Sequence, residues 1–187
     1  MTKAELIKLG KTTKEAKEAA EKAQTERSIA FTIDRVNAKV DEMVEYILRN
    51  VADVMSNGHT HLKFLVSDLR ELDDAEKEVN DSRSLYHYVR IVENEHKDEP
   101  LAEIVEKMLG GRHSIIKAGG RLDRLDDYDR KDYFHLVAGI AQALALQELR
   151  RDGFSIEKVY WNHLMDDRPT EYDVRWDNVA DDYSFSV

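Results

Sequence analysis

The sequence predicts an α+β domain in which a small antiparallel sheet is covered by two long helices. Three observations support this prediction. One helical pattern ends on Asn57-Gly58 and passes directly into a strand, and a second ends on Asp152-Gly153 and does the same. Glycine just after the last periodic residue is typical of a helix C-cap, because it enters the left-handed region without a steric penalty. The chain from Tyr172 to Trp176 alternates polar and apolar side chains, as strands do.

Residues 1–27 are expected to form a helical arm that precedes a single domain over residues 28–187. Two capping-box patterns, each a threonine followed three residues later by glutamate, begin at Thr2 and Thr12. A break between the two is expected at residues 9–11. The rest of the arm is rich in alanine, lysine and glutamate, and alanines are its only apolar face. High helix propensity with nothing large to bury favours contact with a neighbouring subunit.

Apolar residues recur every three or four positions from Ile29 to Val54, which predicts the first long helix over residues 28–56. Residues 68–126 are interpreted as an insertion with an acidic start and short helices. Residues 128–151 are predicted to form the second long helix. The sheet is predicted to contain three strands, at about 61–66, 154–163 and 171–177.

The last two strands are expected to form a hairpin with an apolar inner face. Val159 and Trp161 are predicted to pair with Tyr172, Val174 and Trp176 on that face. Tyr160 has the opposite parity, because successive strand residues point to opposite faces of a sheet. It is therefore predicted to be exposed and available to a partner.

Composition narrows the classes of function. The net charge of −10 opposes direct nucleic-acid binding, because phosphate affinity depends on lysine and arginine. No apolar stretch approaches the roughly 20 residues that a membrane-spanning helix needs. With no cysteine, the chain has no disulfide, thiolate metal site or thiol nucleophile. We expect no cofactor, and a cytoplasmic location.

The densest basic segment lies between two Gly-Gly-Arg triplets, in residues 110–121. Glycines free backbone N–H groups to bind anions, so an anion could dock there. The alternative is a flexible connector or a loop that contacts another subunit. The candidate residues of this segment are Arg112, His113, Lys117 and Arg121.

Two further groups of polar residues suggest chemistry. His59 and His61 share one strand face, the arrangement of a metal-dependent hydrolase, although a polar strand start gives the same pattern. Acidic residues of the hairpin region either form a solvated surface or mimic a phosphate backbone. These acidic residues are Asp166, Asp167, Asp173 and Asp177.

The chain contains a long helix that ends on Asn57-Gly58 and leads into a strand, a second helix–Gly–strand junction at Leu149 to Glu157, and a closing hairpin with Tyr172 to Trp176. This order of elements resembles short phage-encoded α+β proteins of unassigned function. The resemblance implies a non-enzymatic phage protein that acts by protein–protein contact, as a virion structural or assembly component. Its partners would be other subunits of an assembly, including copies of itself, and its location would be a virion or the host cytoplasm. One alternative is an acidic inhibitor of a host defence or nucleic-acid enzyme that mimics DNA. The other is the metal-dependent hydrolase.

Overall fold

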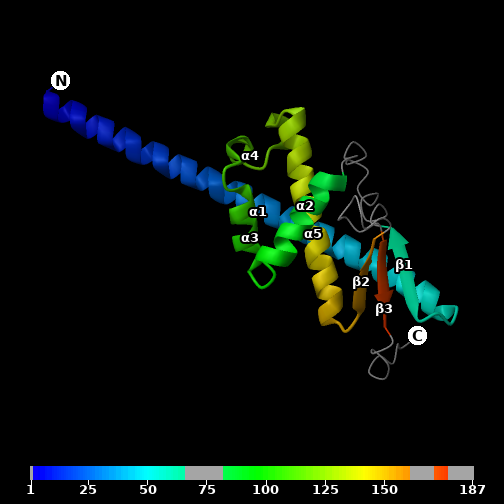
Figure 1. Ribbon diagram of the computed structural model, residues 1–187. Helices are drawn as coiled ribbons and strands as arrows, with labels where there is room; N and C mark the ends of the chain where they lie inside the picture. Colours follow the sequence, from blue (N-terminus) through cyan, green and yellow to red (C-terminus); the bar gives the residue numbers. More distant parts are fainter. Residues whose placement is uncertain (1, 66–81, 161–170, 177–187) are drawn as a thin grey trace. The chain divides into compact units, whose positions relative to one another are not determined.

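The computed structural model describes residues 2–65, 82–160 and 171–176 (Figure 1). The chain forms two compact units. Unit 1 comprises Met1–Asp34 and Glu99–Arg130, and unit 2 comprises Arg35–Asp98 and Lys131–Val187. The described elements are α1 (Lys3–Ser56), β1 (His61–Leu65), α2 (Ser82–Glu95), α3 (Leu101–Leu109), α4 (His113–Ala118), the 3-10 turn η2 (Leu122–Arg124), α5 (Asp127–Arg151), β2 (Ser155–Val159) and β3 (Glu171–Arg175).

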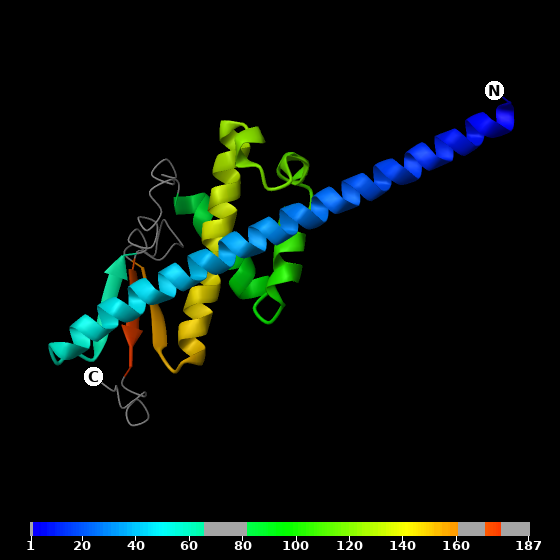
Figure 2. The ribbon, with the colours of Figure 1, turned by 180° about the vertical axis from the view of Figure 1, so that it is seen from behind.

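Helix α1 runs without interruption for 54 residues, about 80 Å at roughly 1.5 Å per residue (Figure 2). The capping box at its start is confirmed: the Thr2 N–H donates to Glu5 Oε2 at 2.6 Å, and the Glu5 N–H donates to Thr2 Oγ1 at 3.3 Å. The predicted break at residues 9–11 is wrong. Thr12 is not a cap either, because its hydroxyl donates to the Lys8 carbonyl inside the helix.

In unit 1, a short helix packs against α1 where a loop was predicted. The Gln24 amide donates to the Lys117 carbonyl, and the Ser28 hydroxyl donates to the Ile116 carbonyl at 3.0 Å. A Cβ at Gly120 would lie 2.8 Å from the Phe31 ring, so glycine is needed for this close approach. The basic segment is therefore ordered by polar and apolar contacts with α1.

The sheet of unit 2 is antiparallel with the order β1-β3-β2, which confirms the predicted α+β class and the three strands. The predicted inner face of β2 is wrong. Lys158, not Val159, is opposite Tyr172, and Val159 is opposite Glu171. Tyr160 therefore has the parity of Lys158, and it is half-buried rather than exposed.

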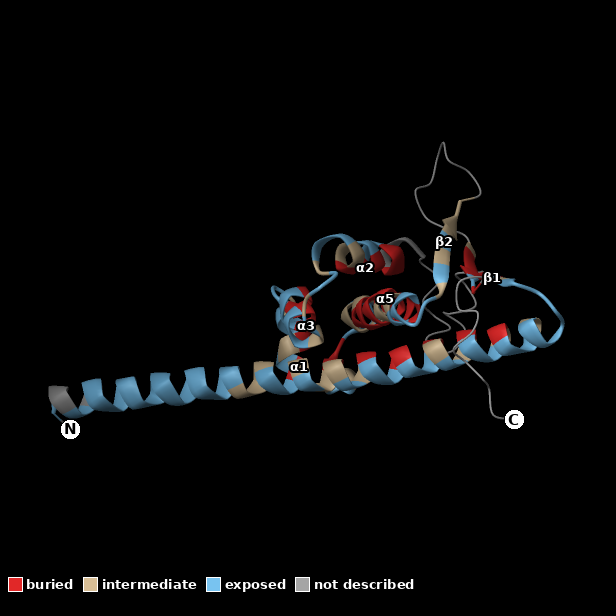
Figure 3. Ribbon diagram, turned by 90° about the horizontal axis from the view of Figure 1, so that it is seen from below, coloured by how far each residue is buried: buried red, intermediate tan, exposed pale blue. Residues whose placement is uncertain are grey.

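Helices α2 and the main part of α5 lie on the sheet face that carries Tyr172. The Gln142 amide of α5 donates to the Tyr172 hydroxyl at 2.8 Å, and Lys158 of β2 reaches Glu93 of α2. From Arg35 onward, α1 presents a buried apolar stripe, which Figure 3 shows as red patches among tan and pale-blue segments. The members of this stripe are Val36, Val40, Met43, Ile47 and Val51.

Both helix–strand junctions of unit 2 are Schellman motifs, as their sequences predict. At the first, the Gly58 N–H donates to the Met55 carbonyl and the next residue donates to the Val54 carbonyl. At the second, Gly153 donates to Arg150 and Phe154 donates to Leu149. The two glycines have φ values of 80° and 95°. These pairs satisfy carbonyls that a helix end would otherwise leave open.

Candidate functional site

The first candidate site is the exposed N-terminal part of α1, within unit 1. Every described side chain from Glu5 to Lys22 is exposed. Ion pairs one helical turn apart join Lys11–Glu15, Lys14–Glu18, Lys17–Glu21 and Lys22–Glu26, with N–O distances between 3.6 and 4.0 Å. Ile7 and Leu9, near the start, are 63% and 58% exposed. This part of α1 is thus a polar, ion-paired rod with a small apolar tip, which we define as Ile7 and Leu9.

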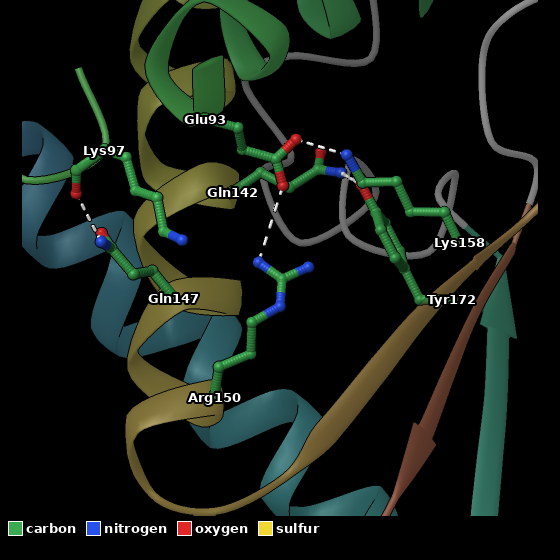
Figure 4. Close-up of polar contacts among 7 residues, drawn as sticks. All are labelled: Glu93, Lys97, Gln142, Gln147, Arg150, Lys158 and Tyr172. Carbon is green, nitrogen blue, oxygen red and sulfur yellow. Dashed lines mark hydrogen bonds and ion pairs between the residues drawn. The ribbon is translucent and has the colours of Figure 1, made fainter. Parts of the chain in front are cut away.

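The second candidate site is a cleft of about 480 Å³ in unit 2, lined by α2, α5, β2 and the turn after α2. Glu93 forms its floor, with only 15% of its side chain exposed (Figure 4). The Lys158 amine donates to Glu93 Oε2, and Arg150 Nη1 lies 3.7 Å from Glu93 Oε1. Glu93 is therefore neutralised mainly by Lys158, and it holds Arg150 only loosely.

A buried polar pair lies behind this floor. Tyr172 and Gln142 are both inaccessible to solvent, and the Gln142 amide donates to the Tyr172 hydroxyl. Burial, together with the charge of Glu93, raises the pKa of Tyr172 well above its ordinary value. Among the described residues, the Gln142 Oε1 atom has no hydrogen-bond partner.

Lys97 is placed at the cleft by its backbone. Gln147 of α5 donates its amide N–H to the Lys97 carbonyl at 2.5 Å, which fixes the turn after α2 beside α5 (Figure 4). Lys97 and Arg151 also line the cleft, and neither makes an ion pair with another described residue. Four cationic and two anionic side chains line a cleft on a chain whose net charge is −10. The cleft is thus a local positive region on an acidic protein.

The four basic residues predicted as an anion loop lie in unit 1, on or beside α4. Arg112 donates to the Met108 carbonyl, while His113 and Lys117 are exposed. Arg121 is exposed and donates to both carboxylate oxygens of Asp123, at 3.3 and 2.8 Å. This pairing raises the pKa of Arg121 and lowers that of Asp123. Arg121 is therefore already bound to a carboxylate, and a subunit-contact role for the segment stays a prediction.

The predicted acidic surface is represented in the described chain by one residue. Asp173 lies in the central strand and is 3% exposed, so the expectation of a surface carboxylate is wrong there. Its Oδ2 atom accepts from Arg175 at 2.8 and 3.1 Å, whereas its buried Oδ1 atom has no hydrogen-bond partner among the described residues. Asp166, Asp167 and Asp177 lie outside the described residues.

His59 and His61 are both exposed at the start of β1. Across residues 2–65, 82–160 and 171–176, no three histidine or carboxylate side chains are grouped so as to hold a metal ion. The two histidines therefore have no further ligands within that part of the chain.

Sequence reasoning missed the cleft. The charged residues of the cleft are spread along the sequence between Glu93 and Lys158, and no periodic spacing in the sequence indicates that they lie together. The one available signal was the Arg150-Arg151 pair directly before the Asp-Gly junction, at a predicted helix C-terminus.

In the described residues, no helix is both long and apolar enough to cross a membrane. Comparison of the chain with protein-family models, with curated proteins and with solved structures gives no match.

Proposed function

We infer that this chain is a non-enzymatic phage protein that acts by protein–protein contact, as a structural or assembly component whose partners include copies of itself. The observation that carries the proposal is the exposed part of α1 with its apolar tip, Ile7 and Leu9. The phage setting rests on the resemblance in the order of helices, junctions and strands.

The ion pairs of the rod contribute little to the stability of this part of α1. Exposed ion pairs in a helix contribute about 0.3–0.5 kcal/mol each, and the order of lysine before glutamate is the weaker one. A stable helix that is polar all round is either held by many ion pairs one turn apart or bridges between domains through solvent. The sequence therefore maintains a rod that serves to hold its tip away from the other elements of unit 1.

The size of the tip favours a repeated contact. Full burial of an isoleucine or leucine side chain contributes about 1.5–3 kcal/mol, so the pair contributes roughly 3–6 kcal/mol before association costs. A single contact of this size is weak. Repetition among the subunits of an assembly raises the effective concentration of each contact and makes weak contacts sufficient.

Sedimentation of the full-length chain over a wide concentration range tests this proposal. We expect concentration-dependent self-association, and its loss in the double variant Ile7→Ser, Leu9→Ser. The matched control is Leu48→Ser with Tyr128→Ser, which removes two other exposed apolar side chains. A chain that stays monomeric throughout, or a control that dissociates equally, would contradict the proposal. Far-UV circular dichroism verifies that α1 remains helical in both variants.

The two alternatives have less support. The acidic inhibitor relied on four carboxylates, of which the described one, Asp173, is buried. The hydrolase relied on His59 and His61, which have no further ligand in the described part of the chain.

A further inference from the structure

We propose that the cleft between α2, α5 and β2 binds a small phosphorylated sugar or polyol. This inference concerns unit 2 alone and does not depend on contacts of the α1 tip.

The cationic side chains of the cleft are only partly used within the protein. Lys158 is bound by Glu93, but the 3.7 Å separation of Arg150 from Glu93 is longer than a hydrogen bond. Lys97 and Arg151 have no ion pair with any described residue. Three cations therefore face one opening with donors available, whereas four lysines of the α1 rod, Lys11, Lys14, Lys17 and Lys22, are paired one turn apart.

A phosphate group fits this set of donors. The guanidinium of Arg150 presents a planar fork that matches two phosphate oxygens, and Lys97 supplies a point charge from the opposite element. The lining carries two more positive than negative side chains, so a dianion neutralises it. The Gln147 bond holds the Lys97 backbone in place before any ligand arrives, which lowers the cost of ordering on binding.

The rest of the lining indicates the body of the ligand. Its described residues include no aromatic ring, so a nucleobase has nothing on which to stack. Asn94, Asp98 and the amide oxygen of Gln147 instead offer partners for hydroxyl groups. A volume of about 480 Å³ is within the range of small-molecule sites. A hydroxyl-rich phosphate ester satisfies both parts of the lining.

Calorimetric titration of the full chain with ribose 5-phosphate, inorganic phosphate and ribose tests this proposal. We expect ribose 5-phosphate to bind about tenfold more tightly than inorganic phosphate, and ribose not to bind. Arg150→Gln and Lys97→Gln should each weaken ribose 5-phosphate binding by about tenfold, which is the effect of losing one charge-assisted contact. Both residues are exposed, and the Glu93–Lys158 pair remains in both variants.

Lys63→Gln is the matched control, because Lys63 is an exposed lysine of β1 that does not line the cleft. Its affinity for ribose 5-phosphate should equal that of the unmodified chain. Equal affinity for ribose 5-phosphate and inorganic phosphate would overturn the proposal. Unchanged binding in both cleft variants, or an equal loss in the control, would also overturn it by showing a non-specific charge effect.

Discussion

Replacing Gly139 by alanine should destabilise unit 2, although alanine is the better helix former. Gly139 is buried in α5 where α2 crosses it. A Cβ at this position would lie 2.5 Å from the Tyr88 Cβ and 2.9 Å from the Leu85 carbonyl oxygen. Carbon atoms in favourable contact are about 3.5–4.0 Å apart, so the new methyl group overlaps α2 by roughly an ångström. Neither neighbouring atom can be moved by a rotamer change.

Two effects of opposite sign set the magnitude. Alanine gains about 0.8–1.0 kcal/mol over glycine in a helix interior. Overpacking of a tight core costs about 1–3 kcal/mol, and here the cost is at the upper end because backbone must move. Separating α2 from α5 also loosens Leu85, Tyr88 and Val89, which are at most 4% exposed. We expect a net loss of about 1–2 kcal/mol in the free energy of unfolding.

Urea titration monitored by tryptophan fluorescence measures this loss, because both tryptophans belong to unit 2. Gly10→Ala is the matched control. It is the same substitution inside a helix, but nothing lies within 4 Å of the new Cβ. Its midpoint should not fall, because alanine is the better helix former and meets no neighbouring atom, and helical ellipticity should rise slightly. A Gly139→Ala chain as stable as the unmodified one would refute the close helix contact.

Two further changes probe the buried pair and a junction. Tyr172→Phe leaves the inaccessible Gln142 donor unpaired and should lower the free energy of unfolding by about 1–3 kcal/mol. In urea titrations, the double variant with Gln142→Leu should lose less stability than the sum of the two single variants. Burial raises the pKa of Tyr172 above its unfolded value of about 10. The stability that the neutral phenol contributes is therefore complete below about pH 10 and is lost as the pH rises beyond it. Above that pH, the unfolding midpoint of the unmodified chain should fall more steeply than that of Tyr172→Phe. Gly58→Ala should lower the free energy of unfolding by about 1–2 kcal/mol, because alanine is strained at the φ of 80°. A clash does not contribute, because no atom lies within 4 Å of the added Cβ. Gly58→Asn should cost less in the same titration, because asparagine tolerates the left-handed region better. Equal losses for alanine and asparagine would contradict the strain argument.

Local signals in the sequence predicted the elements well and their contacts poorly. The two glycine junctions were predictable because a C-cap depends on a few consecutive residues. The break at residues 9–11 was wrong because one glycine costs a helix only about 1 kcal/mol, which its neighbours offset. The parity of β2 was wrong because Lys158 points inward, which no alternation pattern anticipates. The reason is its partner Glu93, which is 65 residues away in the sequence.

The Glu93–Lys158 pair connects the fold of unit 2 to the proposed cleft, and a single substitution separates the two roles. Glu93→Gln leaves Lys158, with 23% of its side chain exposed, without its carboxylate. Breaking a fully buried pair costs about 3–5 kcal/mol, so this partly exposed one should cost about 1–3 kcal/mol. The same change removes a negative charge from the cleft floor and releases Arg150 from its 3.7 Å contact. Urea titration should therefore show a less stable chain, and calorimetry should show ribose 5-phosphate bound several-fold more tightly. A variant that lost both stability and affinity would mean that Glu93 shapes the cleft rather than competing with its ligand.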